Sequence, residues 1–485
     1  MKNKIVLATV NAKKELYANT ANELSAVPVN VQMGLIFSYI KSKGIEVDMI
    51  ESDVDGILME ELIEIIEEKQ PLLCGLICTG ANPSSSTMTM AGIVEFFQKI
   101  ALKKSNIKYF IWGPHPTVLP ERTLRETEAD FVIRGEGYET IVNLFSALGG
   151  NKKIEDISGL SYLEKGYYRQ TQDADLVGNL DTLPMVNWEV MNPSRYRAHN
   201  WHCFGDMDNR TPYAIIWTSF GCPFKCNFCC INNLYGKRVQ RFRSIDSVIN
   251  EISILVEKYN VKHIKILDEL FVVNPKRIKE FCTKLKAKNY DLNIWSYARV
   301  DTINQELLKM LKEVGMNWIS YGFESANPQI LAETNKNCVR NVDEVIKMTQ
   351  REGVHICADV MVGLWNDSFD TMKQTYEFLT KYNFEWANIY PVFAYPGTDL
   401  YEKDSELKSW KTYALYGYEC VPAGTKYLKP HEVLEFRDQA FIKYHSRPEY
   451  LAMIEQKFGC KTKEHLERMT QIPLKRRLLE EKQCF

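Results

Sequence analysis

Four of the 13 cysteines in the chain lie close together, at Cys222, Cys226, Cys229 and Cys230. The first three are separated by three and then two residues, directly after a strand-like run. One loop can therefore present three thiolates to a single metal centre. Iron–sulfur clusters are held by cysteine thiolates, and three thiolates on a four-iron cluster leave one iron open for a further ligand.

A structural zinc site is the alternative interpretation of these cysteines. Such a site usually has four ligands in two Cys-x-x-Cys pairs, and no second pair is present here. Its fourth ligand would have to be Cys230, Cys203 or His202. Cys230 adjoins Cys229 and is therefore poorly placed to bind the same ion. The spacing favours an iron–sulfur cluster on the first three cysteines.

The segment 222–229 resembles the signature of the radical S-adenosylmethionine (SAM) superfamily, Cys-x-x-x-Cys-x-aromatic-Cys, in which Phe228 is the aromatic residue. The resemblance implies a [4Fe-4S] cluster on Cys222, Cys226 and Cys229, whose open iron chelates the amino and carboxylate groups of SAM. One-electron reduction would then cleave SAM to methionine and a 5′-deoxyadenosyl radical. The resemblance also places Phe228 at the SAM site.

Residues after later strands match further SAM-binding positions of this family. Asp268 and Glu269 resemble the acidic pair that holds the methionine amino group, with a solvated approach to the next helix as the alternative. Arg299 follows the next strand, and its guanidinium can meet the SAM carboxylate as a bidentate fork. Glu324 and Ser325 stand in a motif that contacts SAM in relatives.

Two series of alternating strand and helix patterns must position these residues. In the first 150 residues, strand-like runs occur at Lys4–Val10, Ile45–Ile50, Leu72–Thr79, Lys108–Trp112 and Asp130–Ile133. Continuous apolar strands separated by amphipathic helices predict a parallel, doubly wound (Rossmann-like) sheet. Its ligand is expected beyond the carboxyl ends of the strands, near the loops at 11 onward, 80–86 and 113–117.

The second series contains six strand–helix units, two fewer than a complete (β/α)8 barrel. Strands are expected at Tyr213–Thr218, His263–Leu267, Leu292–Tyr297, Trp318–Phe323, Ile356–Val362 and Trp386–Phe393. We therefore predict an α/β chain with an N-terminal domain at 1–150, a linker at 151–210 and a partial (β/α)6 barrel at 211–400. The segment 401–485 is expected to be a helical C-terminal domain.

The N-terminal domain resembles the cobalamin-binding domain of one group of radical SAM enzymes, through the segments 113–117 and 130–139. This resemblance implies that cobalamin contacts residues in these two segments, namely His115, Thr117, Gly135, Glu136 and Gly137. Tight-turn geometry is an equally good explanation of the Gly-Glu-Gly sequence. The motif Asp-x-His-x-x-Gly is absent. We therefore expect base-off cobalamin without a histidine ligand from that loop.

The combined resemblance implies a cobalamin-dependent radical SAM methyltransferase. Such an enzyme methylates an unactivated carbon of a small molecule by means of a 5′-deoxyadenosyl radical and methylcobalamin. It needs an external electron donor such as flavodoxin or ferredoxin. A cobalamin-binding radical SAM cyclase or rearrangement enzyme without net methyl transfer is the alternative. A third possibility is a non-catalytic metal scaffold or cobalamin sensor, which the acidic and arginine residues at successive strand ends disfavour.

Composition excludes several other classes of protein. Lys plus Arg total 60 against 62 for Asp plus Glu, so the formal net charge of −2 gives no general attraction to nucleic acid or anionic membranes. No membrane span is expected, and we predict a cytoplasmic protein. The basic residues Lys237, Arg238, Arg241 and Arg243 indicate either a solvated face or a site for an anionic substrate group.

Five scattered cysteines are predicted to be buried, namely Cys74, Cys78, Cys282, Cys357 and Cys460.

Overall fold

The computed structural model describes residues 2–11, 26–80, 84–101, 103, 106–336, 341–403 and 408–482. Of the loops expected to face a ligand in the N-terminal domain, the one from residue 11 onward therefore falls mostly outside the described residues, at 12–25, and the loop 80–86 does so in part, at 81–83. The third such loop, 113–117, is described in full.

The N-terminal sheet has seven strands in the order β2-β1-β3-β4-β5-β6-β7. Its first five strands are parallel and cover β1 (Lys2–Thr9), β2 (Val47–Glu51), β3 (Pro71–Ile77), β4 (Lys108–Trp112) and β5 (Phe131–Ile133). The strand order 2-1-3-4-5 reverses between β1 and β3, which is where a doubly wound sheet binds its ligand. A hairpin, β6 (Leu160–Glu164) and β7 (Tyr167–Gln170), extends the sheet in the antiparallel sense.

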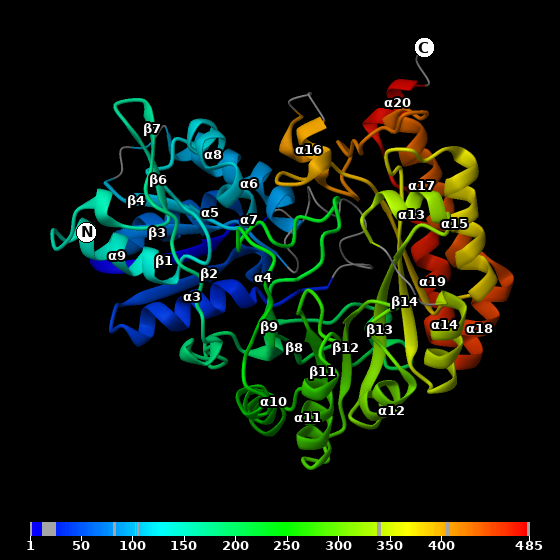
Figure 1. The fold of residues 1–485 in the computed structure, drawn as a ribbon. Helices are drawn as coiled ribbons and strands as arrows, with labels where there is room; N and C mark the ends of the chain where they lie inside the picture. The colour runs from blue at the N-terminus through cyan, green and yellow to red at the C-terminus, as the bar shows by residue number, and fades with distance from the viewer. Residues whose placement is uncertain are drawn as a thin grey trace.

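Helices cover the N-terminal sheet because its strands are apolar on both faces. They are α3 (Val31–Ser42), α4 (Ser52–Asp55), α5 (Met59–Lys69), α6 (Ser85–Ile100), α7 (Pro114–Val118), α8 (Pro120–Thr127) and α9 (Tyr138–Leu148). Figure 1 shows this domain, in blue to cyan, beside the second sheet. Short 3-10 turns, including Trp201–Cys203, connect the two domains.

The second sheet has six parallel strands in the order β15-β14-β13-β12-β11-β8. Within the described residues, its two end strands, β15 and β8, do not pair with each other. It is an open, partial barrel. The strands are β8 (Tyr213–Ile216), β11 (His263–Ile266), β12 (Asn293–Ala298), β13 (Met316–Glu324), β14 (His355–Val362) and β15 (Trp386–Pro391). A short hairpin, β9 (Ser219–Phe220) and β10 (Arg241–Phe242), follows β8.

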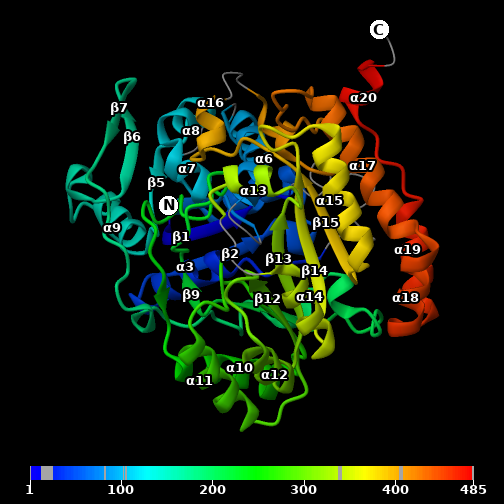
Figure 2. The ribbon, with the colours of Figure 1, turned by 45° about the vertical axis from the view of Figure 1, so that its right-hand side comes forward.

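Each barrel helix is preceded by a Ser or Asn residue that caps its first turn. The Ser or Asn side chain before each helix accepts a hydrogen bond from a backbone N–H of the first turn, as at Ser244 before α10. The helices are α10 (Ile245–Tyr259), α11 (Pro275–Lys286), α12 (Gln305–Glu313), α13 (Pro328–Glu333), α14 (Val342–Arg351) and α15 (Phe369–Tyr382). The helices other than α13 cover the outer face of the sheet (Figure 2), whereas α13 lies beyond the carboxyl end of β13, where the Glu333 carbonyl accepts a hydrogen bond from the Asn227 side chain (2.7 Å).

The C-terminal segment is helical and packs on the β15 side of the barrel (Figure 1). Its helices are α16 (Asp399–Lys403), α17 (Pro430–Ser446), α18 (Pro448–Phe458), α19 (Cys460–Thr470) and α20 (Arg477–Lys482). The predicted fold class is confirmed. One cysteine prediction is wrong: Cys460 is exposed, because it is the first residue of α19. No described helix is both long and apolar enough to cross a membrane.

Glu385 joins the C-terminal helices to the barrel. Its carboxylate is 1% exposed and accepts hydrogen bonds from the backbone N–H of Ile356 (2.9 Å) and from Lys457 Nζ (2.5 Å). Burial alone raises the pKa of Glu385, but His355 and Lys457 outweigh it and bring the pKa down to about 2. The ionised carboxylate therefore stabilises the folded chain at neutral pH.

Glu385→Gln is expected to lower the free energy of unfolding at pH 7 by about 2 kcal/mol, because a charged hydrogen bond is lost. The pKa of Glu385 is lower in the folded chain than its ordinary value of 4.5, so this stability is present above pH 4.5 and is lost as the pH falls toward 2. Urea unfolding between pH 7 and pH 3 tests this. The control is Glu377→Gln at a 60% exposed side chain. Equal stability of Glu385→Gln and wild type at pH 7 would contradict the prediction.

Candidate functional site

The cysteine loop begins directly after β9 and is closed by its own polar contacts. Gly221 has a φ of +85°, and a Cβ there would lie 2.1 Å from the carbonyl oxygen of Val239, so only glycine lets the two arms of the loop meet. The Asn232 side chain donates to the Cys222 carbonyl (3.0 Å) and accepts from the Cys222 N–H (3.2 Å). These contacts fix the position of the first cysteine.

Cys222, Cys226 and Cys229 are half-buried, free thiols that lie near one another. Burial raises the pKa of all three thiols. The Cys222 pKa is raised further by Cys226, and the Cys229 pKa by Cys230 and then by Cys226 and Cys222. The adjacent Cys230 is buried. Three thiols in one loop, without a disulfide, suit a four-iron cluster with one open iron.

The proposed zinc ligands His202 and Cys203 lie elsewhere. They are buried near the amino end of β11, where Cys203 Sγ lies 3.6 Å from His263 Nδ1. His202 Nε2 contacts the Asn293 carbonyl at 3.0 Å, and the Asn293 side chain contacts His263 Nδ1 at 3.0 Å. The cysteine loop follows β8 at the carboxyl ends of the parallel strands. These two residues therefore contact the opposite end of the barrel.

Asp268 follows β11 and is 1% exposed. Its carboxylate accepts three hydrogen bonds of 2.6 Å, from the Thr218 N–H, the Thr218 hydroxyl and the Ser219 hydroxyl. The structure thus places Asp268 beneath the turn that leads into the cysteine loop. Its contacts are those of a residue that positions the loop.

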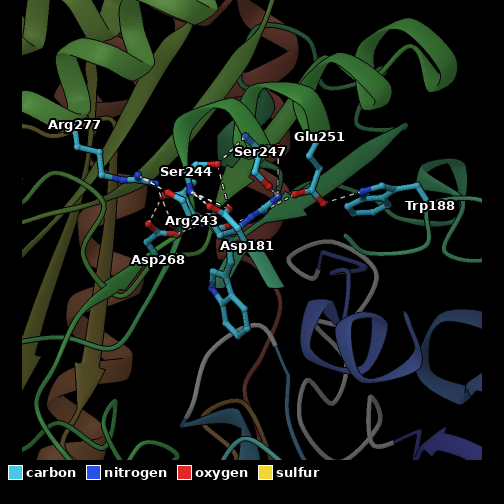
Figure 3. A network of polar contacts seen from close by, with 10 residues as sticks. Asp181, Trp188, Arg243, Ser244, Ser247, Glu251, Asp268 and Arg277 are labelled. Atoms are coloured by element: carbon cyan, nitrogen blue, oxygen red, sulfur yellow. Dashed lines mark hydrogen bonds and ion pairs between the residues drawn. The ribbon is translucent and has the colours of Figure 1, made fainter. Parts of the chain in front are cut away.

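Further charged residues hold the same turn, as Figure 3 shows. Arg277 donates to the carbonyls of Thr218 (3.0 Å) and Arg243 (2.6 Å). Arg243 donates to the Trp217 carbonyl (2.7 Å) and to Glu251 (2.5 Å), and Glu251 also accepts from the Trp188 indole (3.0 Å). This network connects the linker, α10 and α11 to the turn that precedes the cysteine loop.

Glu269 points toward the cysteine loop from the opposite side of the same strand end. Its carboxylate accepts from the Gly221 N–H (3.1 Å) and the Tyr235 hydroxyl (3.3 Å). It is half-buried, and burial raises its pKa to about 8. Of the acidic pair, Glu269 is therefore the residue that faces the three thiols.

Arg299 lies against the cysteine loop. Its guanidinium makes a two-point contact with Asp301 (2.9 and 2.8 Å), stacks 3.9 Å from the centre of the Phe224 ring, and approaches Cys226 Sγ at 4.0 Å. Together with Lys336, it lowers the pKa of Cys226 against the effect of burial. The loop thus has positive charge beside it, which favours bound thiolates.

Glu324 ends β13 with a φ of +61° and pairs with the buried Lys336, whose Nζ lies 2.6 Å from the carboxylate. Lys336 also donates to the Gly322 carbonyl (2.6 Å). Ser325 contacts the Thr375 hydroxyl (3.3 Å). Phe228 is half-buried in the cysteine loop. The sequence motifs did not indicate Lys336, because it follows α13 and no predicted strand leads to it.

The residues predicted for cobalamin have close contacts within the protein. His115 is buried, with Nδ1 3.1 Å from the Thr87 hydroxyl and its ring 4.5 Å from that of Trp410. Burial lowers its pKa to about 3, so the imidazole is neutral. The Thr117 hydroxyl donates to the Gly113 carbonyl (2.8 Å) and accepts from the Gly135 N–H (3.2 Å). The predicted contacts of His115 and Thr117 with cobalamin remain predictions.

The Gly-Glu-Gly turn packs tightly and connects the domains. Gly137 has a φ of +77°, and a Cβ there would lie 2.7 Å from Trp112 Nε1. Glu136 is buried and pairs with Arg241 of β10 through two contacts, of 3.1 and 2.8 Å. Arg241 and Arg243 of the basic run are therefore paired with acids, whereas Lys237 and Arg238 are exposed.

Glu136→Ala is expected to lower the free energy of unfolding by about 3 kcal/mol, because it leaves the largely buried Arg241 guanidinium without its acidic partner. The double variant Glu136→Ala/Arg241→Ala should lose less stability than the sum of the single variants. Denaturant titration measures both quantities. Bound cobalamin, measured by its absorbance in the same samples, tests the predicted cofactor contact separately. Additive single losses would contradict the ion pair.

Three tyrosines of the C-terminal segment, Tyr416, Tyr418 and Tyr427, have different surroundings. Tyr416 packs beside Arg437, whose guanidinium lies 5.3 Å from the ring centre. Tyr418 donates to Glu480 (2.7 Å) at the surface, and Tyr427 is 60% exposed. Arg437 and Glu480 both belong to the C-terminal helices, not to the cysteine loop.

Comparison with known families agrees with this arrangement. Residues 218–379 match the radical SAM superfamily, and residues 24–145 match the B12 binding domain. The first match contains the cysteine loop, Glu269, Arg299 and Glu324. The second contains His115 and the Gly-Glu-Gly turn.

Curated relatives extend over most of the chain. An uncharacterized methyltransferase of Pyrococcus horikoshii is 28% identical over 84% of this chain and 85% of its own length. The anaerobic magnesium-protoporphyrin IX monomethyl ester cyclase of Cereibacter sphaeroides is 26% identical over 80% of this chain and 62% of its own length. One similar solved structure is that of the radical SAM methyltransferase TsrM from Kitasatospora setae, with cobalamin and a [4Fe-4S] cluster bound. It superimposes with a TM-score of 0.64 at 14% identity, and the match covers 82% of this chain and 74% of the TsrM chain.

The chain is a radical SAM enzyme with an N-terminal B12-binding domain, and the predicted class is confirmed. Its cofactors are a [4Fe-4S] cluster, SAM and cobalamin. The three half-buried thiols, with Arg299 and Lys336 beside them, are a donor set that fits the cluster.

Proposed function

We propose that this enzyme transfers a methyl group from SAM, by way of cobalamin, to an unactivated carbon of a small-molecule substrate. The observation that carries the proposal is the joining of a B12-binding domain and a radical SAM domain in one chain. Relatives over most of its length, including a phosphonate methyltransferase of Streptomyces wedmorensis, carry methyltransferase names.

When bound, the cluster and SAM supply a hydrogen-abstracting radical, and cobalamin supplies the methyl carrier. Cys222, Cys226 and Cys229 would hold the cluster. Glu269 faces their loop and offers a carboxylate to the SAM amino group, and Arg299 offers positive charge to the SAM carboxylate. Asp268 keeps the loop in place. Burial of these groups excludes water from the reacting centre.

Product stoichiometry tests the proposal. Each methylation consumes one SAM as the methyl source and one as the radical source. We therefore expect S-adenosylhomocysteine and 5′-deoxyadenosine in equal amounts per methylated product. A reconstituted, anaerobic enzyme that turns over without S-adenosylhomocysteine would not be a methyltransferase.

A cyclase or rearrangement enzyme is the second candidate, because several relatives are named magnesium-protoporphyrin cyclases. It would form 5′-deoxyadenosine without S-adenosylhomocysteine. The same measurement therefore separates the two functions.

We also propose the partner and the domain limits. Lys225, Lys237 and Arg238 are exposed on or just after the cysteine loop, where they fit an acidic electron donor such as flavodoxin or ferredoxin. The near-neutral chain offers no general attraction to nucleic acid. Domain limits near residues 150, 210 and 400 suit the two family matches.

A further inference from the structure

The inner face of the barrel sheet is open near its carboxyl end. Along β14, Asp359 and Met361 are half-exposed while their neighbours Ala358, Val360 and Val362 are buried. Along β15, Asn388 and Tyr390 show the same alternation. Successive side chains of a strand point to opposite faces, and helices cover the outer face (Figure 2). The exposed residues therefore line the interior of the barrel, on the face that also carries Arg299.

Lys265 places a buried positive charge in this interior without an acidic partner. It is 3% exposed, and its Nζ makes neither a hydrogen bond nor an ion pair with the part of the chain that the structure describes. The ammonium lies 4.4 Å from the ring centre of Trp295 and 5.3 Å from that of Tyr297. Lysine is almost never fully buried unless it is paired, so this side chain lacks the partner it would normally have.

Asp359 places the opposite charge in the same interior. Ser320 donates to one carboxylate oxygen, and Asn388 Nδ2 donates to the other at 2.8 Å. The Cys357 thiol also approaches the oxygen that Asn388 contacts, at 4.0 Å, so the oxygen bound by Ser320 is the one that can accept a further hydrogen bond, and the side chain remains half-exposed. Asp359 and Lys265 form no ion pair with each other. Two opposite charges thus face one space from β11 and β14.

We propose that Lys265 and Asp359 bind the substrate of this enzyme, and that the substrate presents an oxyanion to Lys265 and a hydrogen-bond donor to Asp359. The substrate class is a small molecule with a carboxylate or phosphate at one end and a hydroxyl or amino group farther along. This inference rests on the proposed function, because it takes the barrel interior as the place where the radical meets its substrate.

The height of Lys265 in the barrel fits this role. Lys265 pairs in register with Trp295, and Arg299 follows Trp295 by four residues on the same face of β12. At about 3.3 Å per residue, Trp295 lies about 13 Å from Arg299 along the strand direction, toward the amino end of β12 and away from the cysteine loop. An anion held by Lys265 would therefore be the distant end of the substrate, and the reacting carbon would lie nearer the cysteines. Burial, which lowers the Lys265 pKa to about 7, would be offset once an anion binds.

Binding of simple probes to the anaerobically reconstituted holoenzyme tests the inference. The probes are 4-hydroxybenzoate, benzoate, phenyl phosphate and phenol, followed by ligand-observed nuclear magnetic resonance. We expect Lys265→Met to weaken binding of the three anions by about tenfold and to leave phenol unchanged. Asp359→Asn should weaken 4-hydroxybenzoate but not benzoate. The control Lys262→Met removes an exposed lysine from the same segment.

Thermal unfolding separates binding from a structural role. Lys265→Met should be at least as stable as wild type, because it removes a buried charge that has no partner. Unchanged binding of the anions by Lys265→Met, or anion binding by wild type no tighter than that of phenol, would overturn the proposal. Preference for phenyl phosphate over 4-hydroxybenzoate would identify a phosphate, and the reverse preference a carboxylate.

SAM cleavage by wild type and by Lys262→Met, reduced with dithionite in the absence of substrate, distinguishes two kinds of failure. If neither cleaves SAM, the proposed function is wrong. If both cleave SAM but Lys265→Met binds the anions as wild type does, only the substrate assignment is wrong.

Discussion

Cys226→Ala is expected to abolish cleavage of SAM and to remove the iron centre. The cluster would lose one of three thiolates held in a single loop, and no described cysteine other than the buried Cys230 adjoins the set. We expect iron and labile sulfide to fall to about one tenth of the wild-type content. Formation of 5′-deoxyadenosine should fall about a thousandfold or more, since the cofactor supplies the chemistry.

Cys230→Ala is the matched control for this experiment. It removes a buried thiol from the same segment, next to Cys229 but outside the three-cysteine spacing. We expect normal iron and sulfide and near-normal SAM cleavage. If Cys230→Ala loses the metal as completely as Cys226→Ala, and the wild-type protein contains zinc without sulfide, the four-ligand zinc interpretation would be correct.

Asp268→Ala is expected to have the second largest effect. The change leaves three buried donors on Thr218 and Ser219 without an acceptor and removes a negative charge near Arg277. We expect the free energy of unfolding to fall by about 4 kcal/mol. Iron content in the folded fraction should also fall severalfold, because the turn before Cys222 is no longer held. Chemical unfolding and iron analysis measure the two effects.

Asp268→Asn distinguishes the positioning role from direct SAM binding. Asparagine keeps one acceptor oxygen, so about half of the stability loss should be recovered. A direct SAM ligand would behave differently, with normal stability and iron content but weaker SAM binding in equilibrium dialysis. Asp246→Ala is the control, since this aspartate is 82% exposed and pairs only with a surface lysine. Wild-type stability and iron content in Asp268→Ala would disprove the positioning role.

Much of this architecture could be predicted because it rests on local patterns. Lys108–Trp112 is predicted and observed with identical limits. Other limits differ by a few residues, as in β3, which is predicted to end at Thr79 and ends at Ile77. The role of Asp268 was harder to predict, because a sequence shows a carboxylate after a strand but not the hydroxyls that it meets.

The amino-acid sequence by itself determined the order of the domains, the three-cysteine loop and the acidic and basic residues at successive strand ends. Each of these depends on spacing along the chain. Only the tertiary structure decided which side chains meet: Glu136 with Arg241, Lys336 with Glu324, and Lys265 with the rings of Trp295 and Tyr297. Those pairings join residues that are far apart in the chain or lie on different elements. Glu136 lies in the N-terminal domain and Arg241 in the hairpin after β8, so their contact depends on how the two domains pack. Hydrophobic periodicity reports which face of an element is buried, and it carries no information about which residue of another element meets that face.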